Sequence, residues 1–182
     1  MPSTALLVID VQRSAFDGAL IPPIDRPVEL VGNARLLVDS ARGSGTAVVF
    51  VQHCEGAGEP FEVGTPHWEF HDALTPAAGE LVIRKHASSA FEGTDLDERL
   101  RALGVTDLVV CGLQSEHCVS NTSKSALARG YGVRVASDGH STWPSDGRTP
   151  KAIVEAVNSE LESLGAVLEP AQAIAGSLRG RA

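Results

Sequence analysis

The chain has 182 residues, is 43% hydrophobic and carries a formal net charge of −8. This size predicts one domain, residues 1–182, with a sizeable core. The basic residues are scattered and no apolar run reaches the roughly 18 residues of a membrane span, so we expect no nucleic acid and no membrane as partner. An odd number of cysteines and an N-terminus without a basic leader predict a cytoplasmic protein with no disulfide framework.

The first half of the chain predicts strands separated by a helix. Residues 5–9 are wholly apolar and lead into Asp10, which is typical of a central parallel strand buried on both faces. Apolar residues at helical spacing predict a helix over 28–42, which two glycines end. A second strand is predicted at 47–51.

The second half continues this alternation. Short apolar runs predict the remaining strands, at 81–84, around 108–110, at 132–136 and at 166–168. Helices are predicted at about 95–103, from about Cys118 to Gly130, and from Pro150 to Leu164. After about residue 175 the chain shows little pattern.

Strands that alternate with helices of this length indicate right-handed βαβ units. We therefore expect an α/β protein, a three-layer α/β/α sandwich around a six-stranded, mostly parallel sheet. Two long segments, 11–27 and 53–76, have little periodicity. Loops of this length in a compact domain are more often functional than idle.

Three reactive side chains are predicted at the carboxyl ends of strands: Asp10, Lys85 and Cys118. In a parallel sheet these ends share one edge, where ligands bind. A helix that opens near Cys118 would lower the pKa of its thiol, and the free amides would stabilise an oxyanion. The three residues thus predict a base, a charge partner and a nucleophile. Two alternatives stay open: a simple Asp10–Lys85 ion pair, and a cysteine that only fills the core.

Other kinds of chemistry have less support. His67 and His71 lie four residues apart, with His53 and Cys54 upstream, but the segment has no convincing helix and no carboxylate at a familiar ligand spacing. We therefore expect no metal. The chain lacks a complete dinucleotide fingerprint, a phosphate-binding Gly-Lys-Ser/Thr sequence and a Gly-x-Ser-x-Gly elbow, so we expect no cofactor and no serine nucleophile.

A resemblance to a known family rests on three ordered segments: Leu6-Leu-Val-Ile-Asp10-Val-Gln12, Val82-Ile-Arg-Lys85-His-Ala-Ser-Ser-Ala-Phe91 and Gly112-Leu-Gln-Ser-Glu-His-Cys118-Val. In these segments the chain resembles the isochorismatase-like cysteine hydrolases, which include nicotinamidases, N-carbamoylsarcosine amidases and ureide hydrolases. Residues 64–71 and 91–96 also look like family segments, so the resemblance covers nearly the whole chain.

The resemblance implies a Rossmann-like sheet of six parallel strands and a catalytic triad of Asp10, Lys85 and Cys118. It also implies a cis peptide bond between Leu113 and Gln114, with the amides of Gln114 and Cys118 as the oxyanion hole. Members of the family commonly form dimers or tetramers. We therefore expect a homo-oligomer.

Two departures from the family pattern bear on the substrate. Nicotinamidases carry an Asp-x-His zinc motif after the second strand, whereas this chain has Val51-Gln-His53 there, which argues against zinc and against nicotinamide. Ser115 replaces the usual threonine of the cysteine loop and keeps its hydroxyl. Specificity is expected in the two long loops. The candidate substrate contacts are Gln12, Phe16, His53 and Trp68, although Trp68 suits a packing role better.

Together these features predict a hydrolase of small amides or ureides. Asp10, assisted by Lys85, would take the thiol proton, Cys118 would attack the carbonyl carbon, and water would cleave the thioester. A vinyl ether hydrolase is an alternative, as in isochorismatase itself, where an acid at the Asp10 position matters more than the thiol. A non-catalytic redox or interaction module, with Cys118 as its oxidisable thiol, is another. The expected partner is a small-molecule substrate.

Overall fold

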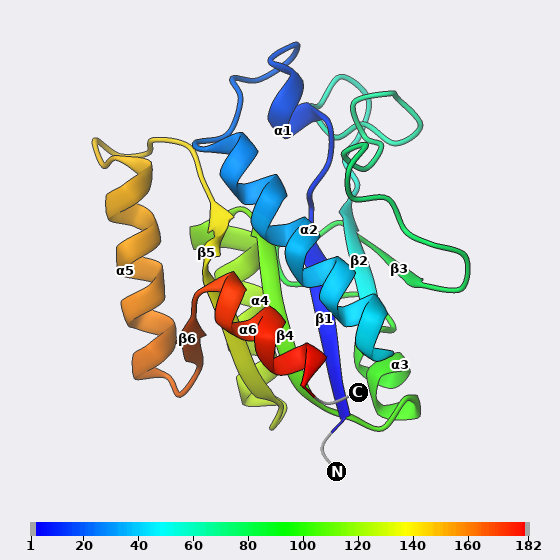
Figure 1. Ribbon diagram of the computed structural model, residues 1–182. Coiled ribbons are helices and arrows are strands. Elements are labelled where there is room, and N and C mark those ends of the chain that lie inside the picture. Colours follow the sequence, from blue (N-terminus) through cyan, green and yellow to red (C-terminus); the bar gives the residue numbers. More distant parts are fainter. Residues whose placement is uncertain (1–2, 181–182) are drawn as a thin grey trace.

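A sheet of parallel strands runs through the middle of the protein between two layers of helices (Figure 1). The structure, a computed structural model, describes residues 3–180. Within this range the sheet has six strands in the order β3-β2-β1-β4-β5-β6, and all neighbouring strands are parallel. The strands are β1 (Ser3–Ile9), β2 (Ala47–His53), β3 (Leu81–Lys85), β4 (Val105–Leu113), β5 (Gly132–Ser141) and β6 (Val167–Glu169). The predicted α/β/α fold class is confirmed.

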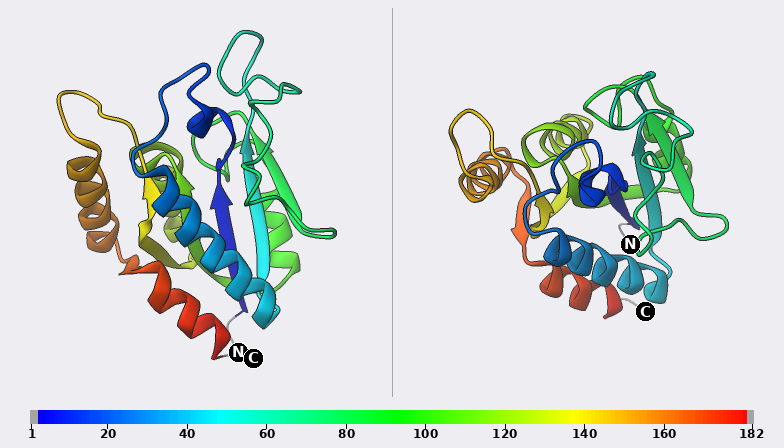
Figure 2. Two further views of the ribbon diagram at one scale, coloured as in Figure 1. Left: turned by 45° about the horizontal axis from the view of Figure 1, so that its top comes forward. Right: turned by 90° about the horizontal axis from the view of Figure 1, so that it is seen from above.

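The helices form two layers. α2 (Pro27–Ser44) and α6 (Ala171–Arg179) lie side by side on one face of the sheet, as the view from above in Figure 2 shows. The opposite face is covered by α3 (Leu96–Ala102), α4 (Ser120–Ala128) and α5 (Pro150–Ser163). A short helix, α1 (Ser14–Asp17), lies in the loop after β1, and a π-helical turn, η1 (Ser115–Val119), precedes α4. Among the described residues, no helix is long and apolar enough to cross a membrane.

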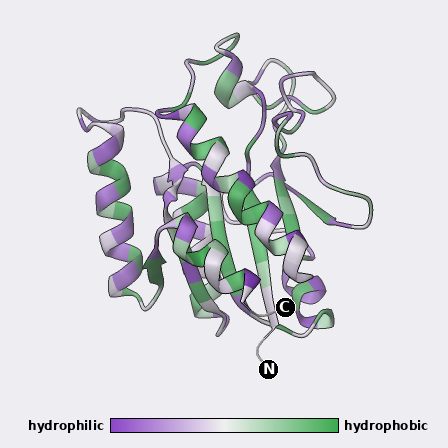
Figure 3. Ribbon diagram, in the orientation of Figure 1, coloured by the Kyte–Doolittle hydropathy of each residue, from purple (hydrophilic) through white to green (hydrophobic). Residues whose placement is uncertain are grey.

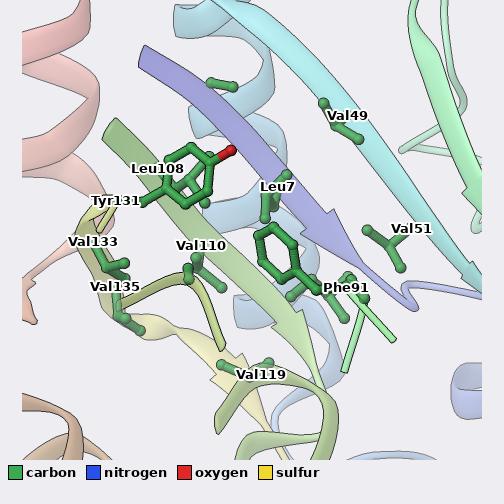
Figure 4. Close-up of a cluster of buried hydrophobic side chains, with 14 of the residues drawn as sticks. Leu7, Val49, Val51, Phe91, Leu108, Val110, Val119, Tyr131, Val133 and Val135 are labelled. Atoms are coloured by element: carbon green, nitrogen blue, oxygen red, sulfur yellow. The ribbon is translucent and has the colours of Figure 1, made fainter. Parts of the chain in front are cut away.

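Each face of the sheet has its own hydrophobic core, because successive side chains of a strand point to opposite faces. Ala5, Leu7 and Ile9 of β1 pack toward α3, α4 and α5, whereas Leu6 and Val8 pack toward α2 and α6. Figure 4 shows the first core, in which valine and leucine side chains of several strands point toward one another and toward Phe91, Val119 and Tyr131 of the connecting segments. The central strands are largely hydrophobic along their length, and the helices alternate between polar and apolar positions (Figure 3).

Three elements differ from the prediction. The fifth strand continues beyond residue 136 to Ser141, because a register shift lets it follow β4 to its carboxyl end. No helix is predicted after the last strand, yet α6 begins at Ala171, extends into the tail and buries Ile174 and Leu178 in the same core as α2. The α-helix predicted from about Cys118 starts at Ser120, and Cys118 lies in the π-helical turn before it.

The edge of the sheet where β1 and β4 end is the point at which the strand order reverses. From β1 the chain proceeds outward to β2 and β3, and after α3 it continues from β4 outward to β5 and β6 on the other side. Ligands of open α/β sheets bind beyond the carboxyl ends of strands at such a point. The fold therefore brings Asp10, Lys85 and Cys118 to the edge where a ligand site is expected.

Candidate active site

Asp10, Lys85 and Cys118 meet at this edge, although they are far apart along the chain. Lys85 Nζ lies 2.8 Å from Asp10 Oδ2 and 3.2 Å from Cys118 Sγ. The side chain of Lys85 is fully buried, and that of Asp10 is 6% exposed. The same ammonium group also donates to the carbonyl oxygen of Ala87 at 3.0 Å and lies 3.3 Å from His53 Nδ1. One buried cation thus connects the carboxylate, the thiol and an imidazole.

The backbone at Asp10 is held by the close approach of β1 and β4. Gly112 of β4 has a φ of +125°, and a Cβ at this position would overlap with the carbonyl oxygen of Ile9. Asp10 itself has a φ of +53°, in the left-handed region, which aspartate tolerates better than most residues. Its Oδ1 is buried and makes no standard hydrogen bond within residues 3–180. This oxygen is therefore available to accept a proton.

Burial and mutual attraction set the protonation of Asp10 and Lys85. Burial raises the pKa of Asp10, and the ammonium of Lys85 offsets part of this effect. For Lys85, burial alone would lower the pKa, but the Asp10 carboxylate and the hydrogen bonds to Asp10 and Cys118 outweigh it, so the pKa is raised. The 2.8 Å contact between Lys85 Nζ and Asp10 Oδ2 is thus a buried salt bridge in which each group offsets the cost of burying the other.

The thiol of Cys118 has a raised pKa, not the lowered one predicted from a helix N-terminus. Burial and the neighbouring Asp10 carboxylate raise the pKa of Cys118 to about 11, against the opposing effect of Lys85. The prediction is wrong because Cys118 lies in η1, before α4 begins, and is next to a carboxylate. At neutral pH the sulfur keeps its proton, so a base is needed before it can act as a nucleophile.

The turn that carries Cys118 is tied to the sheet and to α5. The Leu113–Gln114 peptide bond that leads into it is cis. His140, which is fully buried in β5, accepts a hydrogen bond from Ser115 Oγ at 2.8 Å through Nδ1. Its Nε2 lies 2.8 Å from Asn158 Oδ1 of α5. Because carboxamide oxygens only accept hydrogen bonds, the proton of His140 is assigned to Nε2.

A pocket of about 270 Å³ opens above Cys118. Asp10, His53, Gln114 and Cys118, all predicted site residues, lie in its wall. The other lining residues are Glu55, Phe61, Ser88, Leu113, His117 and Trp143. Of these, only Leu113 had a predicted role, in the implied cis peptide bond, because a periodic pattern does not reveal the direction of side chains in irregular segments and turns. Lys85 lies beneath the pocket, in contact with Asp10 and Cys118.

Three of the predicted substrate contacts lie outside the pocket wall. Gln12 is fully buried, and its carboxamide group bonds to the backbone of His53 in both directions, at 3.0 and 2.8 Å. Trp68 is 6% exposed and donates from Nε1 to the same carbonyl oxygen at 3.0 Å. Phe16 packs edge-on against His71, with ring centroids 4.8 Å apart. Gln12 and Trp68 therefore hold His53 in place rather than facing a ligand.

The residues around His53 do not fit the zinc site of nicotinamidases. Val51 takes the place of the aspartate and is buried in the hydrophobic core. The ring of His53 lies between Lys85 Nζ and Glu55 Oε1, at 3.3 and 3.4 Å from its two nitrogens. Among residues 3–180 there is no cluster of three or more His, Cys, Asp or Glu side chains that could hold a metal ion.

The chain belongs to the isochorismatase family. A model of the isochorismatase domain matches residues 4–166, which is most of the chain. A streptothricin hydrolase from Streptomyces noursei is 40% identical over 146 residues, which cover 78% of this chain and 56% of that protein. The ureidoacrylate amidohydrolase of Serratia proteamaculans is 26% identical over 180 residues, which cover 78% of this chain and 71% of that protein. The chain spans about half the length of the streptothricin hydrolases that it matches.

Solved structures support the same family. An isochorismatase from Pseudomonas putida KT2440 superposes with a TM-score of 0.88 at 30% identity, covering 95% of this chain and 92% of that one. A cysteine hydrolase from Pseudomonas syringae pv. phaseolicola gives a TM-score of 0.91 at 20% identity and covers 98% of this chain and 93% of that one, which bears on the fold alone.

Proposed function

We propose that the protein is a cysteine hydrolase that cleaves the C–N bond of a small amide or ureide through a thioester on Cys118. The observation that carries this proposal is the contact of one buried ammonium, Lys85 Nζ, with both Asp10 Oδ2 at 2.8 Å and Cys118 Sγ at 3.2 Å, next to a pocket. The names of the streptothricin hydrolase and the ureidoacrylate amidohydrolase support hydrolysis as the type of reaction.

The first half of the reaction forms the thioester. The Asp10 carboxylate takes the thiol proton while the sulfur bonds to the carbonyl carbon, and the backbone amides of Gln114 and Cys118 stabilise the oxyanion. Asp10 then gives this proton to the nitrogen, the C–N bond breaks, and ammonia or an amine leaves. The raised pKa of Cys118, about 11, makes this transfer to Asp10 necessary at neutral pH.

The second half regenerates the enzyme. Asp10 takes a proton from water while the hydroxyl oxygen bonds to the thioester carbon. The C–S bond then breaks, Asp10 returns the proton to the sulfur, and the acid product leaves. Lys85 stays protonated throughout, holding Asp10 in position and stabilising the negative charge on sulfur as it develops.

The size of the pocket restricts the substrate to a small molecule. A pocket of about 270 Å³ lies below the range of about 300–1,000 Å³ that is typical of sites for drug-sized ligands. A peptide or a polymer would have to bind mainly outside it. The cytoplasmic location and the homo-oligomeric state stay predictions.

The test is hydrolysis of a panel of small amides and ureides, followed by release of ammonia or amine. We expect Cys118→Ala and Asp10→Asn each to lower kcat/KM by at least about a thousandfold, because neither half-reaction proceeds without them. Unchanged turnover in Cys118→Ala contradicts the proposal. Activity that survives Cys118→Ala but not Asp10→Asn, on a vinyl ether substrate, favours the alternative chemistry.

A further inference from the structure

The carboxylate of Glu55 is held at a fixed position in the pocket wall. It follows β2, and its side chain is 27% exposed. Its Oε2 accepts the backbone N–H of Phe61 at 2.9 Å, and its own N–H donates to the Phe61 carbonyl oxygen at 3.0 Å. Its Oε1 lies 3.4 Å from His53 Nε2. Because these contacts orient the carboxylate before a ligand arrives, little entropy is lost when it binds one.

The negative charge of Glu55 has no cationic partner in the pocket. The ammonium of Lys85, 3.3 Å from His53 Nδ1, is paired with Asp10. Burial and the neighbouring Lys85 charge lower the pKa of His53, so its imidazole is neutral at about pH 7. Among the described residues, no arginine or lysine lines the pocket. Glu55 therefore offers a positively charged ligand a carboxylate that has unused hydrogen-bond capacity and, unlike Asp10, no ammonium partner.

Two aromatic rings lie in the same pocket wall. Phe61, whose backbone holds Glu55, packs edge-on against His53 with ring centroids 6.0 Å apart. The indole Nε1 of Trp143 donates to the carbonyl oxygen of Pro22 at 2.6 Å, which fixes the orientation of its ring. The faces of aromatic rings attract cations, and the attraction is stronger in a partly desolvated site. Glu55, Phe61 and Trp143 together have the chemistry of an ammonium or amidinium site.

Successive short side-chain contacts link Glu55 to the reactive thiol. Glu55 Oε1 lies 3.4 Å from His53 Nε2, and His53 Nδ1 lies 3.3 Å from Lys85 Nζ, which is 3.2 Å from Cys118 Sγ. One imidazole ring and one ammonium group thus separate the carboxylate from the sulfur. A substrate that presents its carbonyl carbon to Cys118 would have its charged group only a few bonds away.

Building on the proposed function, we infer that the pocket selects amides that carry a positive charge, an ammonium or an amidinium, near the scissile bond. Glu55 is the residue that determines this preference. It acts in recognition of the substrate, whereas Asp10, Lys85 and Cys118 carry out the reaction.

The first test measures charge preference at Cys118 without requiring hydrolysis. Two methanethiosulfonate reagents, one with a trimethylammonium group and one with a sulfonate, each convert an accessible thiol into a mixed disulfide. Mass spectrometry of the protein, with Cys118→Ala as the blank, gives their rates at Cys118, and glutathione corrects for intrinsic reactivity. We expect the cationic reagent to react at least about tenfold faster, and Glu55→Gln to reduce this preference by about tenfold.

The matched control is Glu59→Gln. Glu59 is exposed and lies in the same loop, outside the pocket. Its replacement by glutamine removes one negative charge, as Glu55→Gln does. We expect it to alter the preference less than about twofold, because water screens an exposed charge. Glutamine at position 55 keeps an oxygen that accepts the Phe61 N–H, so the loop is retained. An unchanged preference in Glu55→Gln, or an equal change in Glu59→Gln, overturns the inference.

Hydrolysis of three amides of similar length gives the second measurement. 5-Aminopentanamide ends in an ammonium, hexanamide in a methyl group and glutaramate in a carboxylate. We expect kcat/KM to fall in this order, and Glu55→Gln to lower the ratio of the first to the second by about tenfold. Hydrolysis that depends on Cys118 but shows no preference for the cation rejects the inference and leaves the proposed function intact. Charge-selective modification of Cys118 without hydrolysis of any amide supports cation binding at Glu55 and counts against the proposed function.

Discussion

Lys85 is the residue on which the geometry of the site depends. Its ammonium is fully buried and contacts a carboxylate, a thiol, an imidazole and a carbonyl oxygen at 2.8 to 3.3 Å. A buried cation is costly unless it is paired, and removal of one member of a buried pair leaves the other uncompensated. Asp10 and Lys85 therefore depend on each other for stability as well as for chemistry.

Replacing Lys85 with methionine is expected to lower the free energy of unfolding by about 3–5 kcal/mol, because the buried charge of Asp10 loses its partner. The double variant Lys85→Met, Asp10→Asn is expected to recover most of this loss, since no charge then remains buried, while hydrolysis stays absent. Urea denaturation of the two variants and the native protein measures these differences. A Lys85→Met variant as stable as the native protein would show that the ion pair is not important for stability.

The protonation of Cys118 gives a second prediction at the residue scale. Absorbance of the thiolate near 240 nm, taken as the difference from Cys118→Ala, is expected to be absent at neutral pH and to appear only as the pH approaches about 11. Asp10→Asn is expected to move this titration to lower pH, because the carboxylate that raises the thiol pKa is removed while Lys85 remains. A thiolate signal at neutral pH in the native protein contradicts the assigned role of Asp10 as base.

At the scale of elements, the turn η1 owes its position to β5 and α5. Ser115, the first residue of the turn, donates to His140 of β5, which in turn bonds to Asn158 of α5. Asn158 Nδ2 also donates to the carbonyl oxygen of Ser137, at 3.1 Å. This line of hydrogen bonds is fully buried at Ser115 and His140 and partly buried at Asn158, and it orients the backbone between Gln114 and Cys118 without lining the pocket.

Ser115→Ala is therefore expected to lower kcat by about tenfold with little change in KM, because a misplaced turn weakens stabilisation of the transition state more than binding of the substrate. Ser115→Thr keeps the hydroxyl and is expected to retain most of the activity. Steady-state kinetics of Ser115→Ala and Ser115→Thr separates a positioning role of the hydroxyl from a general loss of stability. A general loss of stability would reduce the amount of active enzyme, and threonine would not restore it. Equal activity of the alanine and threonine variants would remove any positioning role from this hydroxyl.

The sequence predicts the elements better than the details of the site. Apolar runs predict all six strands, and the carboxyl ends of three of them bring Asp10, Lys85 and Cys118 to one edge. Strand alternation cannot reveal that Gln12 turns inward to the backbone of His53, because that depends on the path of a long loop. The thiol pKa could not be predicted either, because burial and the distance to a charge are properties of the folded chain.

At the scale of the whole molecule, the buried histidine links stability to pH. Burial lowers the pKa of His140 from its usual 6.5, chiefly by desolvation. As the pH falls below about 6.5, His140 takes up a proton in the unfolded chain before it does so in the folded one. Its contribution to stability is therefore present above about pH 6.5 and is lost as the pH falls.

The contribution of His140 to the free energy of unfolding is therefore expected to decrease from about pH 7 to about pH 5, so the native protein should lose stability relative to His140→Gln, which cannot titrate, over this range. Urea denaturation across this range measures both slopes. His53 and His71 also have lowered pKa values through burial and contribute to the same slope, so the difference between the two proteins is the quantity to compare. Parallel slopes would mean that His140 titrates alike in the folded and unfolded chains.

The central claim, that Cys118 carries the acyl group of an amide substrate, is tested most directly by acid quench of the reaction within the first turnovers and mass spectrometry of the protein. We predict an added mass equal to the acyl part of the substrate, located on the peptide that contains Cys118 and released by hydroxylamine. The Cys118→Ala variant is expected to form no such adduct. An adduct on another residue, or turnover that continues undiminished in Cys118→Ala, would contradict the account.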